Sequence, residues 1–144
     1  DEITFLFSSN PGVPLKPLEK VASGGELSRI FLACKSILKE KTEVGSLIFD
    51  EVDVGIGGTT AKRIAQKLKD LSQNYQVLCV THLPQIAVLA DIHYVVEKEI
   101  KEKETKTKIK KVEGEERLKE IARMLGDPQN LELAKSFLEA QNLT

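Results

Sequence analysis

Hydrophobic positions along this chain of 144 residues follow two different patterns. Short continuous apolar runs occur in GSLIFDE at 45–51 and QVLCVTH at 76–82. Such runs are typical of strands that are buried on both faces of a parallel sheet. Apolar residues at helical spacing occupy 24–41 and 59–73, directly before each of these runs. The alternation of helix and buried strand predicts an α/β fold, mainly a parallel sheet flanked by helices.

Both of these helices are predicted to be amphipathic. The apolar residues at helical spacing in the first are Leu27, Ile30, Phe31, Cys34, Ile37 and Leu38. Those expected to point inward from the second are Ile64, Ala65, Leu68 and Leu71.

Weaker signals predict the remaining elements. They are a strand at 2–8, an irregular proline-containing loop at 9–20, a short helix beginning at Pro84, a β-hairpin formed by 93–100 and 105–113, and two C-terminal helices at 115–126 and 131–141. Pro84 suits the first turn of a helix, and Gly-Asp-Pro at 126–128 separates the last two helices.

The amino-acid composition excludes fewer classes of function than the hydrophobic pattern does. The formal net charge is −1, from 21 basic and 22 acidic residues, so the whole chain has no charge bias toward a polyanion. No run approaches ~18 apolar residues, so no membrane span is predicted. Cys34 and Cys79 both lie in apolar runs, which favours free, buried thiols in a reducing compartment. The abrupt start at Asp1 is expected of an excerpt from a longer chain.

Polar residues follow both buried strands. Asp50 and Glu51 end the first, and Thr81 and His82 end the second. Taken alone, an Asp-Glu pair is usually a cap or a solvated turn, and a single histidine is usually structural. Ligands of open α/β sheets bind at the carboxyl ends of strands, so the coincidence favours a site. Asp50 could hold Mg²⁺ through water and Glu51 could deprotonate an attacking water, which suits phosphoryl transfer.

Two glycines open the first helix, although glycine costs about 1 kcal/mol relative to alanine inside one. Free N–H groups at Gly24 and Gly25 would form an anion site with the helix dipole, and the Ser23 hydroxyl would add a donor. The plainer interpretation is a capping box, because Ser23 and Glu26 have the required spacing. Both interpretations can hold together.

Four segments in this order resemble the motifs of ABC-type ATPases. ASGGE (22–26) resembles the signature motif, SLIFDE (46–51) the Walker B strand, VDVGIGG (52–58) the D-loop, and VTH (80–82) the switch histidine. The longer stretches NPGVPLKPLEKVASGGELSR, CVTHLPQIAVLAD and IARMLG resemble, more specifically, a bacterial DNA-repair branch related to the SMC proteins. The resemblance implies that residues 1–144 are the C-terminal half of a P-loop ATPase head.

The resemblance also implies a role for each matching residue. The signature residues Ser23, Gly24, Gly25 and Glu26 would contact ATP held by the other protomer of a head-to-head dimer. Asp50 would support Mg²⁺ and Glu51 would be the general base, while His82 would sense the γ-phosphate. Asp53, Gly55 and Gly57 would lie in the D-loop at the dimer interface. The implied partners are the protein's own N-terminal ATPase half, a second head and DNA, in a cytoplasmic, nucleoid-associated protein without membrane contact.

One motif of the family is missing from these residues. No GxxxxGK[ST] phosphate loop occurs in them, so this segment alone is expected to be inactive. Two alternatives remain open: a non-catalytic dimerisation or regulatory module with this fold, and the head segment of another SMC-like ATPase. In a complete head, strands of the N-terminal half would lie beside this sheet. Without them, 46–50 or 76–80 would present an open, apolar sheet edge.

The hairpin carries the candidate DNA-contact patch. Its lysines are Lys98, Lys101, Lys103, Lys106, Lys108, Lys110 and Lys111. Glu99, Glu102 and Glu104 are interleaved with them, and a solvated face is the commoner meaning of such a run. Both interpretations stay open at this stage.

Overall fold

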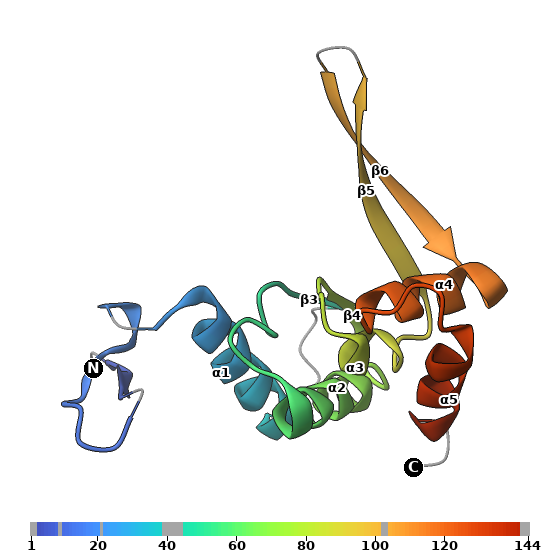
Figure 1. Ribbon diagram of the computed structural model, residues 1–144. Helices are drawn as coiled ribbons and strands as arrows, with labels where there is room; N and C mark the ends of the chain where they lie inside the picture. The colour runs from blue at the N-terminus through green and yellow to red at the C-terminus, as the bar shows by residue number, and fades with distance from the viewer. Residues whose placement is uncertain (1–2, 9, 21, 39–44, 102–103, 142–144) are drawn as a thin grey trace. The chain divides into compact units, whose positions relative to one another are not determined.

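The computed structural model describes residues 3–8, 10–20, 22–38, 45–101 and 104–141 (Figure 1). The elements are β1 (Leu6–Phe7), β2 (Lys16–Pro17), a 3-10 turn (Leu18–Lys20), α1 (Gly24–Ile37), β3 (Ser46–Phe49), α2 (Gly58–Leu71), β4 (Gln76–Cys79), α3 (Pro84–Ala87), β5 (His93–Lys101), β6 (Glu104–Val112), α4 (Gly114–Met124) and α5 (Leu131–Gln141). The predicted order of elements is confirmed from α1 onward, whereas the irregular loop predicted at 9–20 contains β2 and the 3-10 turn. The strand expected at 2–8 is only two residues long within its described part.

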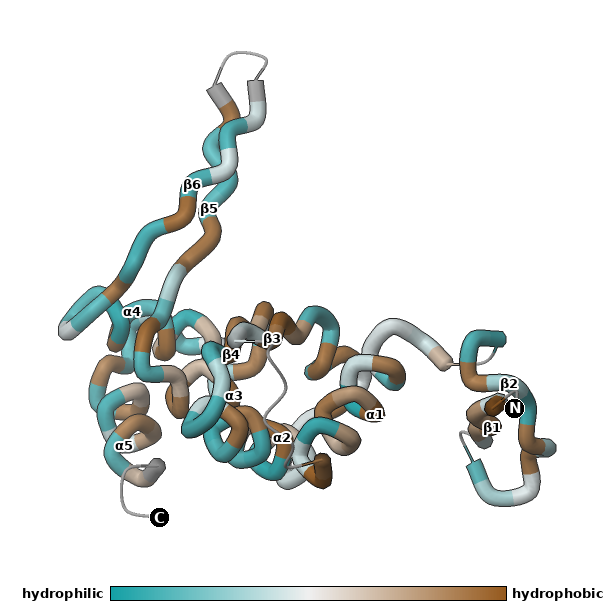
Figure 2. The backbone as a smooth tube through the Cα atoms, turned by 180° about the vertical axis from the view of Figure 1, so that it is seen from behind, coloured by the Kyte–Doolittle hydropathy of each residue, from teal (hydrophilic) through white to brown (hydrophobic). Residues whose placement is uncertain are grey.

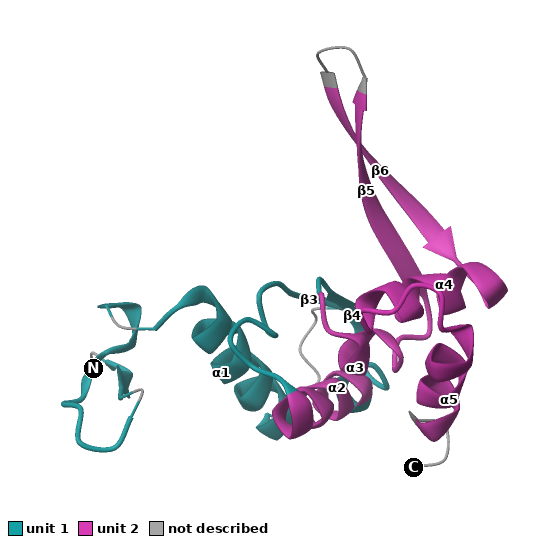
Figure 3. Cartoon of the chain, in the orientation of Figure 1, with its two compact units in different colours: residues 1–57, 70–81 teal, residues 58–69, 82–144 magenta. Residues whose placement is uncertain are grey.

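The chain divides into two compact units (Figure 3). Unit 1 comprises residues 1–57 and 70–81, and unit 2 comprises residues 58–69 and 82–144. The candidate residues from Ser23 to Gly57 therefore fall in unit 1, together with β3, β4 and Thr81, whereas Gly58 falls in unit 2. The hairpin and the helices α3 to α5 fall in unit 2.

A parallel pair of strands forms the sheet of unit 1. β3 and β4 run in register from Ser46 opposite Gln76 to Phe49 opposite Cys79. The Val80 N–H donates to the Phe49 carbonyl at 2.9 Å and extends the ladder. The predicted neighbourhood of the two strands is confirmed. The described sheets are nevertheless all two-stranded, and the other two, β1–β2 and β5–β6, are antiparallel.

The expectation that both faces of these strands are buried is wrong. Leu47 and Phe49 are buried, but Ile48 between them is 70% exposed. Leu78 and Val80 are exposed as well. Successive side chains of a strand point to opposite faces, so one face of the β3–β4 pair is covered and the other presents apolar side chains to solvent.

Helix α1 buries a different face from the one that its apolar residues suggest. The residues Gly25, Ser28, Arg29 and Leu32 have the i, i+3, i+4, i+7 spacing of one helix face, and Gly25 and Leu32 are buried. The exposed members of the predicted apolar face are Leu27, Phe31, Cys34, Ile37 and Leu38.

The prediction of two buried cysteines is thus wrong for Cys34. Its exposed thiol lies on that apolar face of α1, whereas Cys79 on β4 is partly buried. Apolar neighbours in the sequence do not bury a thiol when the helix face that carries it is itself uncovered.

Unit 2 is organised around an apolar core. Its buried members are Ala87, Val88, Ile121, Ala122 and Ala134, from α3, its C-terminal end, α4 and α5. The partly buried residues packed against them are Leu89, Leu118, Met124, Leu125, Leu131, Phe137 and Leu138. On α2, the predicted inward residues Ile64, Ala65, Leu68 and Leu71 are all buried. The amphipathic pattern of α2 therefore predicted its buried residues correctly; of these, Leu71 belongs to unit 1.

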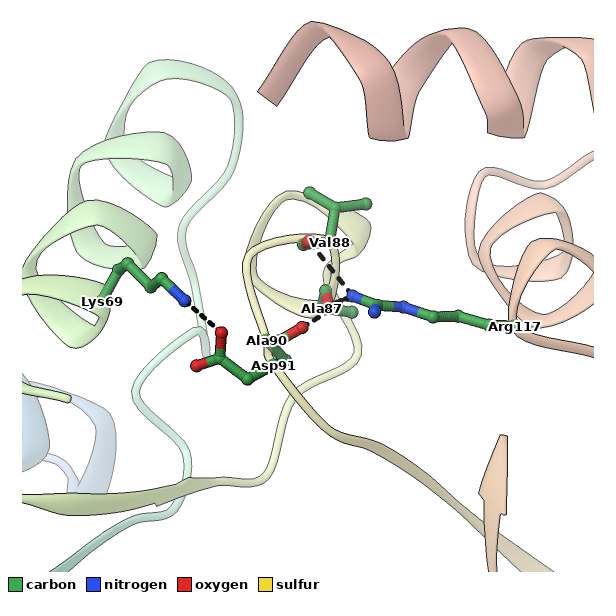
Figure 4. A network of polar contacts seen from close by, with 6 residues as sticks. All are labelled: Lys69, Ala87, Val88, Ala90, Asp91 and Arg117. Carbon is green, nitrogen blue, oxygen red and sulfur yellow. Dashed lines mark hydrogen bonds and ion pairs between the residues drawn. The ribbon is translucent and has the colours of Figure 1, made fainter. Parts of the chain in front are cut away.

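Polar contacts fasten the short helix α3 within unit 2 (Figure 4). The Arg117 guanidinium, on α4, donates to the Ala90 carbonyl at 2.8 Å and to the Val88 carbonyl at 3.2 Å. Lys69 on α2 forms an ion pair with Asp91 at 2.5 Å. A cation at carbonyl groups near a helix C-terminus complements the helix dipole, so Arg117 holds the end of α3 that precedes the hairpin.

The antiparallel hairpin is confirmed. Nine residues of β5 pair with nine of β6, from His93 opposite Val112 to Lys101 opposite Glu104. None of the described helices is long and apolar enough to cross a membrane.

Candidate functional site

A capping box begins helix α1. The Glu26 N–H donates to Ser23 Oγ at 3.3 Å, and the Ser23 N–H donates to Glu26 Oε2 at 2.8 Å. The hydrogen bonds from the Ser23 backbone and then from its side chain lower the pKa of Glu26. The predicted cap is confirmed, and it occupies the N–H groups of Ser23 and Glu26. The N–H groups of Gly24 and Gly25 stand between them in the first turn, where an α-helix has no internal acceptors to offer.

The two glycines pack against Glu51 at the end of β3. A Cβ atom added to Gly25 would lie 2.8 Å from the Glu51 carbonyl oxygen and 3.3 Å from the Val54 Cβ. A Cβ atom on Gly24 would lie 2.1 Å from Glu51 Oε2, which is the movable end of a flexible side chain. Position 25 therefore requires glycine, because the Glu51 backbone leaves no room for a side chain. Gly24 lies beside the carboxylate of Glu51, which was predicted to be the general base.

Glu51 has an uncommon backbone conformation. Its φ angle of 57° is the only positive value among the described non-glycine residues. Such a conformation costs energy and persists where neighbouring contacts impose it, often at functional sites. Here the Glu51 N–H donates to Asp50 Oδ1 at 2.9 Å, and the Glu51 carbonyl accepts from the Val54 N–H at 3.1 Å.

Two residues of α1 that sequence reasoning did not select bind this turn. Ser28 Oγ donates to the Asp50 carbonyl at 2.6 Å. Arg29 Nη1 donates to the Val54 carbonyl at 2.9 Å and to the Val52 carbonyl at 3.3 Å. The signal that could have revealed them is their spacing, because both share a helix face with Gly25. We call Ser28, Arg29 and residues 50–54 the α1–turn clamp.

Asp53 is fixed inside unit 1. It is 2% exposed, and its Oδ2 accepts a hydrogen bond of 2.6 Å from Thr81 Oγ1 at the end of β4. Burial first, then the charges of Asp53 and Asp50, raise the pKa of Cys79 to about 12. The structure thus brings Thr81 to Asp53, three residues beyond Asp50, at the shared carboxyl end of β3 and β4.

The remaining predicted residues are placed as follows. Gly55 has a φ angle of 72°, which favours glycine, and Gly57 has open space around its Cα. His82 is exposed and belongs to unit 2. Its convergence with Asp50 and Glu51 stays a prediction.

The exposed Asp50 carboxylate suits a magnesium ion whose other ligands are waters and substrate phosphates. Asp50 and Glu51 are both exposed. Among the described residues, no group of three or more histidine, cysteine, aspartate or glutamate side chains could hold a metal ion. Mg²⁺ commonly keeps several waters and binds one or two carboxylates together with substrate phosphates. Asp50 fits that mode of binding, and the described carboxylates do not form a closed protein cage.

Comparison with known proteins identifies the relatives of this chain. It is 51% identical over 144 aligned residues to the DNA repair protein RecN of Treponema pallidum, which covers 99% of this chain. It is 49% identical to RecN of Bacillus subtilis and 51% identical to RecN of Vibrio cholerae, over 94% and 90% of this chain. No family model matches. The chain is homologous to a segment of RecN.

The homology concerns part of each RecN protein. The chain spans 25% of the Treponema pallidum protein and 23% of each of the other two.

A solved structure resembles the fold of this chain. A chain from a study of ATP-driven dimerisation and DNA-stimulated activation of SMC ATPases matches with a TM-score of 0.52 and 19% sequence identity. The match covers 83% of this chain and 79% of that chain. This chain thus shares its fold with that chain over most of its length.

Proposed function

We propose that this chain is the C-terminal part of a RecN-type ATPase head that acts in DNA double-strand-break repair and recombination. The observation that carries the proposal is the packing of the Gly24–Gly25 helix start against Glu51 at the end of β3. It joins a segment that resembles the signature motif to one that resembles the Walker B strand. The names of the relatives and the SMC-like fold support the assignment.

Each candidate residue has a distinct task in this proposal. The N–H groups of Gly24 and Gly25 and the Ser23 hydroxyl donate hydrogen bonds to the γ-phosphate of an ATP held by a second head. Glu51 takes the proton of the attacking water as general base. Asp50 orients the hydration shell of Mg²⁺, which supplies charge neutralisation at the phosphates when it is bound.

The other motif residues act around this centre. His82 senses the γ-phosphate, and Glu26 stabilises the first turn of α1 through the capping box. Asp53, Gly55 and Gly57 belong to the D-loop at the interface between heads. Thr81 holds the Asp53 carboxylate at 2.6 Å and so sets the path of that loop.

The complete activity requires other parts of the protein. The 144 residues contain no GxxxxGK[ST] sequence, so the N-terminal ATPase half supplies the main nucleotide cradle. We expect the isolated chain neither to hydrolyse ATP nor to bind it with micromolar affinity. Calorimetry with Mg²⁺ present measures this directly, and micromolar binding would contradict the half-site assignment. Head dimerisation and DNA binding, in the cytoplasm near the nucleoid, are functions of the assembled protein.

The deciding experiment compares Glu51→Gln with Asp50→Asn in the complete protein. Loss of the general base should lower ATP turnover by about 10²–10⁴-fold while ATP stays bound and the heads stay joined. Asp50→Asn should weaken Mg²⁺-dependent ATP binding as well as turnover. Glu132→Gln, at an exposed position on α5, is the matched control and should leave both unchanged.

The outcomes distinguish the alternative functions. Near-normal turnover of Glu51→Gln would assign the base to another residue. A complete protein without ATPase activity, unchanged by both substitutions, would favour a non-catalytic dimerisation module. Activity in a protein that takes no part in DNA repair would favour another SMC-like head.

A further inference from the structure

The two faces of the hairpin differ sharply in chemistry. Residues that are directly opposite each other in an antiparallel pair lie on the same face, and successive residues alternate between faces. The first face, here called the paired face, carries Val95, Glu97, Glu99, Lys106, Lys108 and Lys110. The second, here called the apolar hairpin face, carries Tyr94, Val96, Lys98, Ile100, Thr105, Thr107, Ile109 and Lys111.

Charges on the paired face neutralise one another. Glu97 lies opposite Lys108, and Glu99 lies opposite Lys106. Lys108 also forms an ion pair of 3.0 Å with Glu99, and Lys110 forms one of 2.5 Å with Glu116 on α4. Most of the lysines that suggested DNA contact therefore have carboxylate neighbours. Lys103 lies outside the described residues.

The paired face is also the side that looks toward the helices. Val95 and Lys110 line a groove of about 600 Å³ together with Glu116 and Arg123 of α4. Val112, at the base of the hairpin, is buried. The paired face thus lies toward α4 near the base of the hairpin, and the apolar hairpin face lies on the opposite side.

The apolar hairpin face is open to solvent. Val96 lies directly opposite Ile109, and Ile109 and Ile100 are 70% and 80% exposed. Tyr94 is more than half exposed at the base of the same face. Figure 2 shows the alternating hydrophobic segments along both strands of the projecting hairpin. A two-stranded hairpin is only marginally stable in water unless something packs on its hydrophobic face, and a contiguous exposed apolar surface commonly marks an interaction site.

The charge of the hairpin indicates what kind of partner fits. Its described residues contain six lysines and three glutamates. None of the described side chains on the apolar hairpin face is acidic, whereas Lys98 and Lys111 flank its apolar residues. Lys111 forms an ion pair with Glu113 just beyond the strand, so Lys98 supplies the charge available beside Val96 and Ile100.

The geometry points to a docking site for an acidic, amphipathic protein helix on the apolar hairpin face. Leucine-like side chains of the partner pack on Val96, Ile100 and Ile109, and a carboxylate pairs with Lys98. The stretch from Tyr94 to Ile100 is ~20 Å long, which matches a helix of ~13 residues. The phosphates of DNA would pair with the lysines, but DNA offers no apolar surface that would pack on Ile100 and Ile109. This site is separate from the proposed ATPase residues, all of which lie outside the hairpin.

A labelled synthetic peptide tests the docking site on the 144-residue chain. The probe is a fluorescein-labelled helical peptide of about four turns with leucine at i, i+3, i+4 and i+7 positions and glutamate elsewhere. One matched peptide replaces each glutamate with lysine, and another replaces each leucine with serine. Fluorescence anisotropy should show binding of the acidic leucine peptide at least about tenfold tighter than of either matched peptide.

Variants locate the binding on one face of the hairpin. The pair Val96→Thr and Ile109→Thr should weaken binding about tenfold or more by removing apolar contact. Lys98→Glu should reverse the charge preference, so that the lysine peptide binds more tightly than the glutamate peptide. The controls are Glu97→Gln and Lys108→Gln on the paired face, which should leave peptide binding and its charge preference unchanged. Circular dichroism of each variant verifies that the fold persists.

Several results would overturn the inference. They are absence of binding up to ~1 mM peptide, equal binding of the acidic and basic peptides, and binding unaffected by the Val96 and Ile109 substitutions. Duplex DNA binding abolished by Val96→Thr and Ile109→Thr would assign the face to nucleic acid instead. A dimer in light scattering that Ile109→Thr dissociates would assign it to a second copy of the chain.

Discussion

The two units of this chain are stabilised in different ways. Unit 2 has a buried apolar core formed by α3, α4 and α5, which includes Ile121 and Ala134. Unit 1 buries Leu47 and Phe49 of its sheet but leaves Ile48 of the same strand open to solvent. Its best-defined contacts are polar and involve backbone carbonyl groups, as in the α1–turn clamp.

This difference separates a self-contained core from a unit that is built for further contacts. Burial of apolar area drives folding at roughly 25 cal/mol per Å², and unit 1 leaves much of its apolar area unburied. Polar clamps instead hold its Glu51 turn in one conformation. We interpret unit 1 as the part that is completed by the rest of the protein, in agreement with the quarter of RecN length that the chain spans.

The largest expected effect comes from the core of unit 2. Ile121 is 0% exposed, and Ile121→Ala should lower the free energy of unfolding by about 2–5 kcal/mol. Ile48→Ala in unit 1 should change it by no more than about 0.5 kcal/mol, because the side chain is already in water. Urea unfolding followed by circular dichroism measures both. Equal losses would show that something covers Ile48, such as a second copy of the chain.

The sequence predicted the elements and their order well because local patterns determine them. The capping box at Ser23 and Glu26 has its expected geometry, and β3 pairs with β4 in parallel. Apolar runs and helical spacing show which side chains are apolar, and burial is inferred from that pattern alone. They therefore predicted burial for Ile48 and Cys34, although the described chain leaves both exposed.

The candidate site was predictable only in part. The places of Asp50, Glu51 and Thr81 just after β3 and β4 were predicted from the apolar strands before them, and their roles at a site stay a prediction. The clamp by Ser28 and Arg29 depends on which face of α1 meets the turn, and the apolar pattern of α1 favoured the opposite face. The left-handed conformation of Glu51 has no signal in sequence, since left-handed positions usually carry glycine or asparagine.

An intermediate effect is expected at Gly24 and Gly25, which pack against the Glu51 turn. Gly25→Ala places a methyl group 2.8 Å from a backbone oxygen, and such overpacking costs about 1–3 kcal/mol. Gly24→Ala meets only the movable carboxylate of Glu51, and a gain in helix propensity of up to about 1 kcal/mol offsets this contact. Unfolding by denaturant, with hydrogen exchange at residues 50–54, distinguishes the two. A larger loss for Gly24→Ala would contradict the backbone contact of Gly25.

The smallest effect, a difference in thiol reactivity, tests which side of unit 1 is covered. Cys34 lies on the exposed face of α1, whereas burial raises the pKa of Cys79 to about 12. Because the thiolate is the reactive species, iodoacetamide at pH 8 should alkylate Cys79 at least about tenfold more slowly than Cys34. Unfolding in urea should remove the difference, which peptide mass spectrometry resolves at each site. In the complete protein Cys34 should become protected, since the apolar face of α1 would then be covered. Rapid alkylation of Cys34 there would mean that this face stays open, and the interpretation of unit 1 as a unit completed by the rest of the protein would fail.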